Sequence, residues 1–529
     1  MSESQHPDSP LPLIPRPIRF VHRGEVQQVT GLPPTTTVLQ WLRDTAHCTG
    51  SKEGCAEGDC GACTVVIGEL DDQGQWQQRT VNSCIQFLPT LDGKALITVE
   101  DVARGVAQVA QLHPCQQSLV ACHGSQCGFC TPGFVMSLWH IYETHEQAPP
   151  RTALADALSG NLCRCTGYRP ILDAAQQMFE APRAAADHTK TATQLKTLAA
   201  SAAPSLVYVG PSQADGGHAQ RFMSPQTLDE LAALRLQYPD ARLLAGGTDV
   251  GLWVTKQFKD LGDIIYLGHI PALRTIERHA DHLTIGAAAS LEDAWSALVD
   301  AYPSLREIWL RFASPPVRHA GTLGGNLSNG SPIGDGAPIL LALDARLVLR
   351  RGPYTRQIPL SSFYLDYMTN DLQPGEWLQS IEVPLPVVPH TGTSTSTHHL
   401  RAYKISKRRD SDISAVCAGL AITLDQGRIT EARLAWGGMA ATARRAPLTE
   451  AAMVGRPWTE ATLRQAQAAL AQDFQPLTDL RASDHYRRTV AANLLERFWL
   501  ETRPDAPLAP EAVQVWPSTT QAAATGAQA

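Results

Sequence analysis

The chain has 529 residues, of which 43% are hydrophobic, and a formal net charge of −7. At roughly 150 residues per domain, this length predicts several domains, each with its own core. The weak negative charge does not favour binding to nucleic acid or to an anionic membrane surface. We find no secretory signal in MSESQHPDSPLPLIP and no apolar run that could span a bilayer, and we therefore expect a cytoplasmic protein.

The first predicted domain covers residues 16–100 and is rich in strands. The stretch IRFVHRGEVQQVTG favours a hairpin that turns at Arg23-Gly24. Thr36 or Thr37 is expected to cap the short helix VLQWLRDTAH. A cysteine-containing loop follows, then the strand TVVIGEL, a polar turn and the strand ALITVE. Strands around one helix, with a cysteine loop between them, resemble the β-grasp fold of plant-type ferredoxins.

Four cysteines of this domain follow the C-x4-C-x2-C pattern with a distant fourth member, which is the plant-type [2Fe–2S] spacing. They are Cys55, Cys60, Cys63 and Cys84. Glycines inside GCAEGDCGAC let the backbone wrap closely around a cluster and leave amides free to bond its sulfides. Zinc sites more often use two short pairs than three close thiolates and a lone fourth. The sequence therefore predicts a [2Fe–2S] cluster here.

A helical domain is predicted over residues 101–182, and it contains a second cysteine quartet. The members are Cys127, Cys130, Cys163 and Cys165. The first pair lies just before a helix that we expect to begin with Thr131 as its cap and Pro132 as its first residue. The second pair lies just before a helix opened by Pro170. Helix N-termini favour negative charge, so an anionic cluster with four thiolates suits both places.

Spacing alone leaves the second quartet open between a cluster and a tetrahedral zinc site. Two short cysteine pairs can hold zinc, and the neighbouring Cys122 and His123 add alternative ligands. The C-x-C pair is tighter than a usual zinc knuckle and favours a cluster modestly. The other cysteines, Cys48, Cys115 and Cys417 together with Cys122, are expected to be buried free thiols that pack as small apolar residues.

The rest of the chain divides at two polar breaks. Residues 183–204 are rich in Ala, Thr and Lys and are expected to be a linker. An α/β domain is predicted over 205–387, and an α+β domain over 398–503 follows PHTGTSTSTHH. The tail 504–529 has the composition of a disordered segment.

Two glycine-rich loops in the α/β domain suggest a pyrophosphate-containing cofactor. LLAGGTDVG covers 243–251 and GTLGGNLSNGSPIGD covers 321–335. Such turns present backbone N–H groups to phosphate oxygens, although neither matches a Rossmann or Walker pattern. A pair of one-electron centres needs an electron partner, and a flavin is the usual one. The basic run KISKRRDSD, 404–412, is either a solvated loop or a rim where a dinucleotide could dock.

Five of these motifs, in this order, resemble the molybdenum hydroxylase family. They are GCAEGDCGAC, SQCGFCTPG, GNLCRCTGYRPI, AGGTDVG and GTLGGNLSNGSPIGD. Iron–sulfur domains followed by a flavin domain are similar to the small subunit of the bacterial xanthine dehydrogenase type, over roughly residues 18–500. The resemblance implies an α+β multidomain fold. Its parts would be a β-grasp ferredoxin domain, a four-helix [2Fe–2S] domain, an FAD-binding domain like that of vanillyl-alcohol oxidase, and a C-terminal domain like that of the CO dehydrogenase flavoprotein.

The same resemblance assigns the second quartet to a [2Fe–2S] cluster and implies a set of FAD contacts. Those residues are Leu243, Leu244, Ala245, Gly246, Gly247, Thr248, Asp249, Val250, Phe312, Thr322, Leu323, Gly324, Gly325, Asn326, Asp335, Leu378 and Lys404. Lys404 is expected at the flavin, where its charge would stabilise the reduced, anionic form. The family often carries two arginines followed by three acids, whereas Ser411 replaces one acid here. That departure leaves the preference between NAD+ and oxygen open.

Partners also follow from the resemblance. It implies NAD+ as acceptor and a second polypeptide, the large subunit with the molybdopterin, because the chain stops where the molybdenum domain of fused relatives would begin. A dimer of heterodimers that oxidises hypoxanthine and xanthine is the expected assembly. The alternative in the same class acts on aldehydes, carbon monoxide or heteroaromatic acids. The alternative in another class is a colourless, zinc-stabilised scaffold protein without a redox role.

Overall fold

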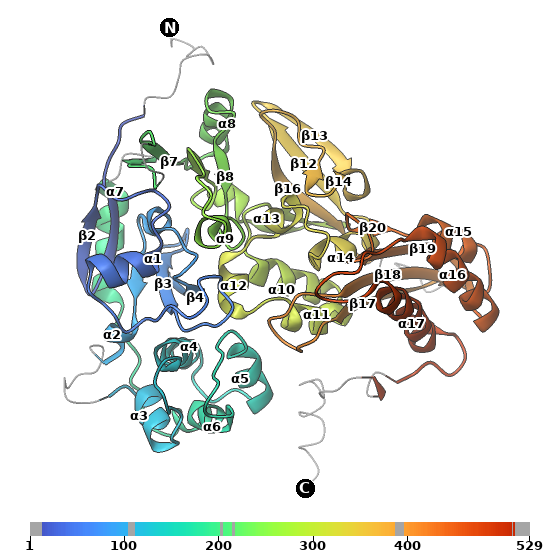
Figure 1. The fold of residues 1–529 in the computed structure, drawn as a ribbon, viewed down its shortest axis with the longest axis horizontal. Coiled ribbons are helices and arrows are strands. Elements are labelled where there is room, and N and C mark those ends of the chain that lie inside the picture. Colours follow the sequence, from blue (N-terminus) through green and yellow to red (C-terminus); the bar gives the residue numbers. More distant parts are fainter. Residues whose placement is uncertain are drawn as a thin grey trace.

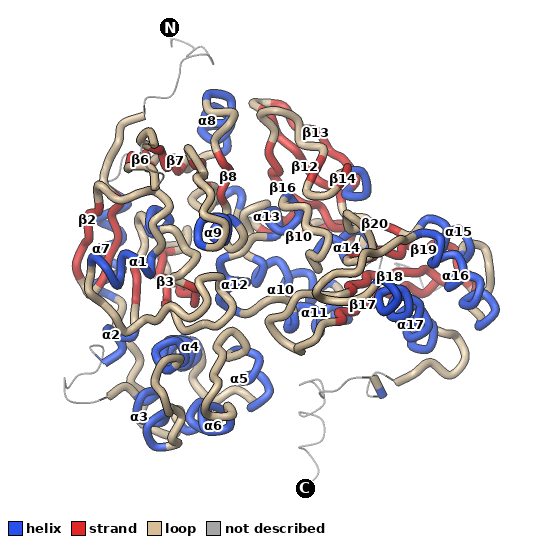
Figure 2. Tube along the Cα trace, viewed as in Figure 1, coloured by secondary structure: helices blue, strands red, loops and turns tan. Residues whose placement is uncertain are grey.

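The computed structural model describes residues 13–103, 112–201, 205–213, 217–386, 396–509 and 512–513. A strand-rich domain leads into a group of helices, then into an α/β region, and the chain ends in a sheet covered by helices (Figure 1). Figure 2 shows the same order with strands in red and helices in blue. The predicted α+β multidomain class is confirmed. The predicted tail 504–529 falls largely outside the described residues.

The first sheet has the strand order β2-β1-β5-β3-β4, in which only β1 and β5 are parallel. Its strands are β1 (Ile18–His22), β2 (Glu25–Val29), β3 (Thr64–Leu70), β4 (Trp76–Asn82) and β5 (Ala95–Ile97). The predicted hairpin turns at Arg23 and Gly24, both with positive φ. Thr37 caps α1 (Val38–Gln40) in a capping box, and a π-helical turn at Trp41–Thr45 continues it. The strand β4 was not distinguished in the sequence.

In the described part of the second domain, a group of helices lies below the first sheet in Figure 1, and α4 (Thr131–Thr144) packs on β3 and β4. The helices are α3 (Pro114–Ala121), α4, α5 (Arg151–Ala157) and α6 (Arg169–Gln177), preceded by α2 (Val99–Val102). The central helix α4 buries Phe134, Leu138 and Trp139 among its apolar residues. Because most of its residues are apolar and buried, α4 is the core around which the other helices are arranged.

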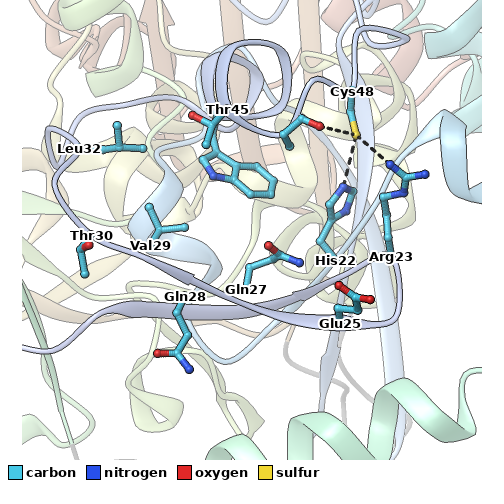
Figure 3. Close-up of a pocket in the computed structure, with 12 residues that line it drawn as sticks. His22, Arg23, Glu25, Gln27, Gln28, Val29, Thr30, Leu32, Thr45 and Cys48 are labelled. Carbon is cyan, nitrogen blue, oxygen red and sulfur yellow. Dashed lines mark hydrogen bonds between the residues drawn. The ribbon is translucent and has the colours of Figure 1, made fainter.

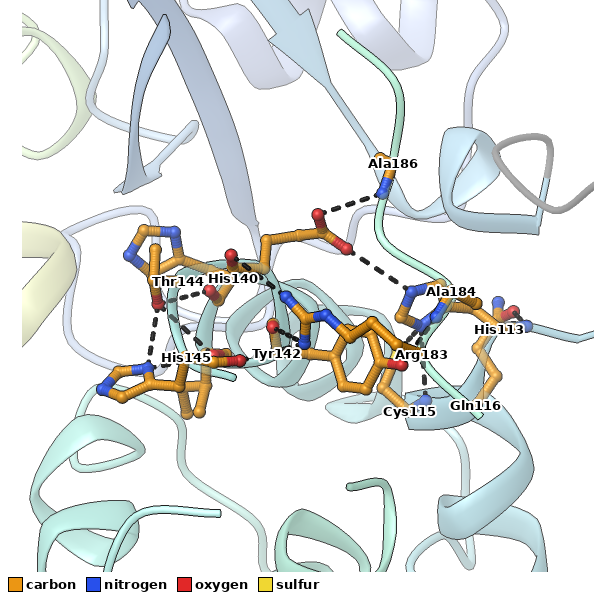
Figure 4. A network of polar contacts seen from close by, with 12 residues as sticks. His113, Cys115, Gln116, His140, Tyr142, Thr144, His145, Arg183, Ala184 and Ala186 are labelled. Carbon is orange, nitrogen blue, oxygen red and sulfur yellow. Dashed lines mark hydrogen bonds and ion pairs between the residues drawn. The ribbon is translucent and has the colours of Figure 1, made fainter. Parts of the chain in front are cut away.

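The expected linker at 183–204 contains the helix α7 (Thr189–Ser201), which packs on β1 and β3. Its Leu195 is buried together with residues of the first sheet. Ahead of α7, Arg183 donates to the carbonyl oxygens of Tyr142 and His145 at the end of α4, at 2.5 and 2.9 Å (Figure 4). Residues 183–201 therefore contact both of the first two domains and lead on to the third.

The α/β region holds two sheets, ordered β6-β7-β9-β8 and β10-β11-β16-β12-β13. The strands of the first are β6 (Leu206–Gly210), β7 (Gln220–Ser224), β8 (Arg242–Leu244) and β9 (Ile264–Tyr266), with α8 (Leu228–Gln237) and α9 (Val250–Thr255). Those of the second are β10 (Ile276–Arg278), β11 (His282–Gly286), β12 (Arg346–Arg351), β13 (Tyr354–Pro359) and β16 (Trp377–Pro384). A small hairpin joins β14 (Tyr364–Asp366) to β15 (Thr369–Asn370).

Five short helices lie between β11 and β12 of the second sheet. They are α10 (Leu291–Ala301), α11 (Arg306–Arg311), α12 (Pro315–Ala320), α13 (Leu323–Ser328) and α14 (Gly336–Ala342). The helix α12 packs on β4 of the first domain, and α14 packs on the sheet of the last domain. The α/β region therefore contacts both of its neighbours directly.

The last domain is an antiparallel sheet, β17-β18-β19-β20, with helices on both faces. Its elements are β17 (Ser396–Ile405), β18 (Val416–Asp425), β19 (Arg428–Gly437), β20 (Arg444–Arg445), α15 (Pro447–Met453), α16 (Glu460–Asp473) and α17 (Asp484–Thr502). Cys417 belongs to the core shared with α14, while its neighbours Val416 and Ala418 belong to the core under α17. This alternation is that of a strand buried on both sides.

The cores of the first and third domains are continuous. Phe20 and Trp41 of the first domain pack in one apolar cluster with Tyr208, Phe222 and Tyr266 of the third. The two domains are therefore held in one relative position by buried apolar surface. Among the described helices, none is both long enough and apolar enough to cross a membrane.

Candidate redox site

The first cysteine quartet gathers at the end of the β3–β4 hairpin. Cys55, Cys60 and Cys63 lie on the loop before β3, and Cys84 follows β4. The backbone N–H of Cys60 lies 3.4 Å from the sulfur of Cys55. Thiol contacts lower the pKa values of Cys55 and Cys63 and raise those of Cys60 and Cys84. Cys55 therefore lies beside Cys60 and Cys84, and Cys63 lies beside Cys84. Among the described residues, no three such side chains are already placed as metal ligands, so the fit to a cluster rests on the four thiols and their pairwise contacts.

The second quartet forms at the N-termini of α4 and α6. Burial and contact with Cys163 raise the pKa of Cys130 to about 12. Contact with Cys127 raises the pKa of Cys165. Burial raises the pKa of Cys163, but hydrogen bonds outweigh this effect and the pKa is lowered overall. One of these bonds comes from the hydroxyl of Thr166, which donates to the sulfur of Cys163 at 3.2 Å. The quartet is asymmetric in exposure, because Cys127 and Cys165 are exposed while Cys163 is buried.

The predicted start of α4 needs a correction. The cap position is Cys130, so Thr131 and Pro132 are the first and second helical residues. The hydroxyl of Thr131 lies 2.7 Å from that of Ser125 and makes no cap bond. A candidate metal ligand therefore occupies the helix terminus itself, where the unpaired backbone N–H groups are.

The remaining cysteines differ in burial. Cys48, Cys115 and Cys417 are buried, as expected, whereas Cys122 is half-buried and donates to Gln177 at 2.7 Å. Cys48 lines a cavity of 540 Å³ beneath the first hairpin, where its sulfur lies 3.7 Å from Nε2 of His22 (Figure 3). Burial raises the pKa of Cys48, so a neutral thiol is favoured there.

The two glycine-rich loops lie side by side. The first runs from β8 into α9, and the second begins at Thr322, whose hydroxyl accepts from the N–H of Gly325 at 3.1 Å and caps α13. A side chain at Gly246 would collide with the carbonyl oxygen of Ala320 and would lie 2.7 Å from Cα of Gly321. Asp249 of the first loop also contacts Asn329 after α13. The loops therefore form one continuous backbone surface.

This surface has a polar atom without a protein partner. The side-chain oxygen of Asn326 is buried and makes no hydrogen bond, and there is no room for a side chain at Gly336 beside it. A buried acceptor without a donor is costly, so a ligand with hydroxyl groups would stabilise it. Burial also raises the pKa of Asp249, although the amide of Asn329 opposes that shift. These features fit the polar chain and pyrophosphate of FAD.

The predicted flavin lysine is already engaged within the protein. Lys404 on β17 donates to Asp335 at 2.5 Å and to the hydroxyl of Ser414 at 2.9 Å. Ser414 in turn donates to the other oxygen of Asp335 at 2.5 Å. All three side chains are buried. The structure thus joins two predicted FAD residues in a buried ion pair, in which Asp335 offsets the charge of Lys404.

Phe312 and Leu378, also predicted as flavin contacts, lie in the large apolar core of the α/β region. Phe312 packs against Trp295, with ring centroids 5.7 Å apart, and Leu378 pairs with Leu349 across β16 and β12. Leu323 of the second loop belongs to the same core. Their contact with a flavin stays a prediction.

The basic loop after Lys404 spans the domains. Arg408 forms an ion pair with Asp59, beside Cys60, at 3.4 Å, and Ser411 donates to the carbonyl oxygen of Ser159 at 3.2 Å. The predicted choice lay between a solvated loop and a docking rim. The loop has exposed residues and also contacts the two cysteine-bearing domains, and docking of a dinucleotide there stays a prediction.

The three candidate sites form a chain. Leu162, next to Cys163, donates its N–H to the carbonyl oxygen of Cys60 at 3.0 Å. On the other side, a Cβ at Gly251 would lie 2.6 Å from the carbonyl oxygen of Ile85, next to Cys84. The second quartet, the first quartet and the glycine loops are therefore in successive contact. The sequence did not predict that Gly251 packs against the loop of Cys84. The available signal was its position at the end of the first glycine-rich loop.

A substitution of Gly246 tests the joined loops. Gly246→Ala should separate them, destabilise the α/β region by about 1–3 kcal/mol and lower the ratio of bound flavin to protein, because a Cβ meets rigid backbone. Flavin absorbance after gel filtration measures this. Gly262→Ala is the matched control, because Gly262 has positive φ but open space around it, so flavin retention should be unchanged. Equal flavin loss in both variants would contradict the prediction.

Comparison with known proteins places these sites in a class of redox proteins. Family models match four consecutive segments: a 2Fe–2S iron–sulfur cluster binding domain at 20–88, a [2Fe–2S] binding domain at 98–176, an FAD binding domain in molybdopterin dehydrogenase at 218–386, and a CO dehydrogenase flavoprotein C-terminal domain at 401–502. Each cysteine quartet lies within one of the two [2Fe–2S] models. The alternative of a zinc-stabilised scaffold is therefore overturned.

Curated relatives of this chain include xanthine dehydrogenases. The chain is 34% identical over 537 residues to the xanthine dehydrogenase of Emericella nidulans and 31% identical over 552 residues to the xanthine dehydrogenase/oxidase of Gallus gallus. Each alignment covers 91% of this chain but only 38% and 40% of the relative, so the chain spans about two fifths of their length. The chain belongs to the molybdenum hydroxylase family and contains two [2Fe–2S] domains and an FAD-binding domain.

A solved structure gives a partial match. The carbon monoxide dehydrogenase from Hydrogenophaga pseudoflava, in a form that lacks the Mo-pyranopterin moiety, is 28% identical, with a TM-score of 0.48. The match covers 94% of that chain and 52% of this one. The family assignment therefore rests on the four domain models and the curated relatives.

Proposed function

We propose that this chain carries electrons from a molybdopterin centre on a partner polypeptide to NAD+ during the oxidation of hypoxanthine and xanthine to urate. The successive contact of the second quartet, the first quartet and the glycine loops is the observation that carries the proposal. When bound, the two clusters would supply one-electron steps and the flavin would convert them into hydride transfer. The printed names of the curated relatives support the purine substrate and the dehydrogenase activity.

The cysteines hold the clusters in this proposal. Cys55, Cys60, Cys63 and Cys84 would bind one, and Cys127, Cys130, Cys163 and Cys165 would bind the other. The second cluster would be the entry point, because Cys127 and Cys165 are exposed and the neighbouring Phe129 and Tyr168 are exposed too. Exposed aromatic residues beside a cluster suit a partner interface.

The glycine loops and Asp335 would hold FAD. The loops supply backbone N–H groups for the pyrophosphate, and Asn326 supplies the acceptor that lacks a partner. The pair of Lys404 and Asp335 would fix the end of the second loop and limit the charge presented to the flavin. We propose a dimer of heterodimers as the assembly, on the family resemblance alone.

A spectroscopic experiment on the complex with its native partner tests the proposal. Xanthine added without oxygen should bleach the flavin and cluster absorption, and NAD+ should restore it while NADH appears. Substrate-free complex with NAD+ is the control and should not change. Bleaching by an aldehyde, carbon monoxide or another heteroaromatic compound, and not by xanthine, would keep the electron path and discard the purine assignment.

A further inference from the structure

Asn161 connects the two cysteine-bearing loops through its side chain. Its amide nitrogen donates to the carbonyl oxygen of Gly61 at 3.1 Å and to the hydroxyl of Thr64 at 3.2 Å, both in the first domain. Its amide oxygen accepts from Ser137 on α4 at 2.6 Å. Only 3% of Asn161 is exposed. One buried amide therefore links α4 of the second domain to the loop that carries Cys60 and Cys63.

The backbone next to Asn161 also links the two quartets. Leu162 donates its N–H to the carbonyl oxygen of Cys60 at 3.0 Å and is bonded to Cys163. A proposed ligand of one cluster is thus one hydrogen bond and one residue away from a proposed ligand of the other. Any movement of Asn161 relative to Gly61 changes this link directly.

The backbone around the side-chain amide of Asn161 is closely packed. The φ angle of Gly61 is 69°, and a Cβ there would collide with the carbonyl oxygen of Gly160 and lie 3.0 Å from Cα of Asn161. A Cβ at Gly133 would collide with the carbonyl oxygen of Gly61. Backbone lies against backbone here, so a small shift of either loop would disturb the hydrogen bonds that cross the contact.

We propose that Asn161 is a positioning residue that holds the two cluster-binding loops at a fixed separation and thereby sets the magnetic and electronic coupling between the clusters. This inference rests on the proposed function for the presence of both clusters. Asn161 acts through Gly61 and Leu162 and binds no cofactor itself. Loss of the amide would leave Gly61 with its bonds from Thr64 within the first loop, at 2.7 and 3.1 Å. Each loop would keep its own structure, and the backbone bond from Leu162 to Cys60 would remain without the side-chain bonds of Asn161 that support it.

The test compares Asn161→Ala with Ser137→Ala in the holoprotein. Ser137→Ala removes the bond to α4 but leaves both bonds that cross to the first domain, so it is a matched control. After complete reduction with dithionite, low-temperature electron paramagnetic resonance shows the signal of each cluster and the splitting caused by their interaction. We expect loss of the splitting in Asn161→Ala, with both signals at full intensity and normal iron content. Ser137→Ala should keep the splitting.

Each other outcome overturns the inference or the proposed function. Unchanged splitting in Asn161→Ala, or loss of one cluster's signal and iron, would show that the amide does not position the loops or serves cluster retention instead. If Asn161→Ala does not fold, Asn161→Asp tests the inference in its place. The aspartate keeps the shape of the side chain and the acceptor for Ser137, but it has no donor toward Gly61 and Thr64. It should lose the splitting at neutral pH, and unchanged splitting would overturn the inference. Absence of both signals in the unsubstituted protein would refute the proposed function.

Discussion

Replacing Cys163 with serine should abolish one of two [2Fe–2S] signals and leave flavin bound. Cys163 is buried, contacts Cys130 and accepts from Thr166 at 3.2 Å, so its sulfur has a fixed place in the quartet. Removing even an outer-shell partner typically lowers metal affinity or activity about 10–100-fold, and loss of a ligand should exceed that. Electrons supplied by the partner would then fail to reach the flavin.

Paramagnetic resonance, iron analysis and flavin absorbance of the same sample measure this result. Cys115→Ala is the matched control, because Cys115 is a buried thiol of the same domain, and burial raises its pKa as expected of a neutral group. It should keep both signals and the rate of flavin reduction. If Cys163→Ser kept both clusters, the assignment of the second quartet would be wrong.

Lys404→Met should destabilise the flavin-binding region by about 3–5 kcal/mol, because it leaves the carboxylate of Asp335 buried without a cation. Side-chain exposure is 2% for Lys404 and 6% for Asp335, so water cannot replace the lost partner. Since Asp335 ends the second glycine loop at the start of α14, we also expect weaker flavin binding. Flavin fluorescence, which rises on release during heating, should show a lower release temperature.

Two further variants isolate the cause. Lys404→Met combined with Asp335→Asn should recover part of the stability, because no uncompensated charge is left in the core. Arg464→Ala removes ion pairs on the exposed faces of α16 and α17, and it should leave the release temperature unchanged. A release temperature in Lys404→Met equal to that of the unsubstituted protein would show that the buried pair does not support the flavin loops.

Local signals in the sequence were sufficient where a structure depends on near neighbours. The hairpin turn at Arg23-Gly24 and the cap at Thr37 each involve bonds within a few residues, and both were predicted. The ligand spacing of the cysteines and the order of the motifs indicated the family and its cofactor domains, which the family models confirm. The start of α4 was predicted one residue too late, because the hydroxyl of Thr131 bonds Ser125.

Pairings between distant segments were decided by the tertiary structure. The partner of Lys404 is 69 residues away, that of Asn161 at Gly61 is 100 away, and that of Arg408 at Asp59 is 349 away. No spacing rule reaches so far, because these contacts exist only after each domain has buried its own core and the domains have packed together. The sequence by itself therefore determined which cofactor domains this chain contains. Only the tertiary structure decided which backbone groups bring their sites into contact, because these contacts cross domain boundaries.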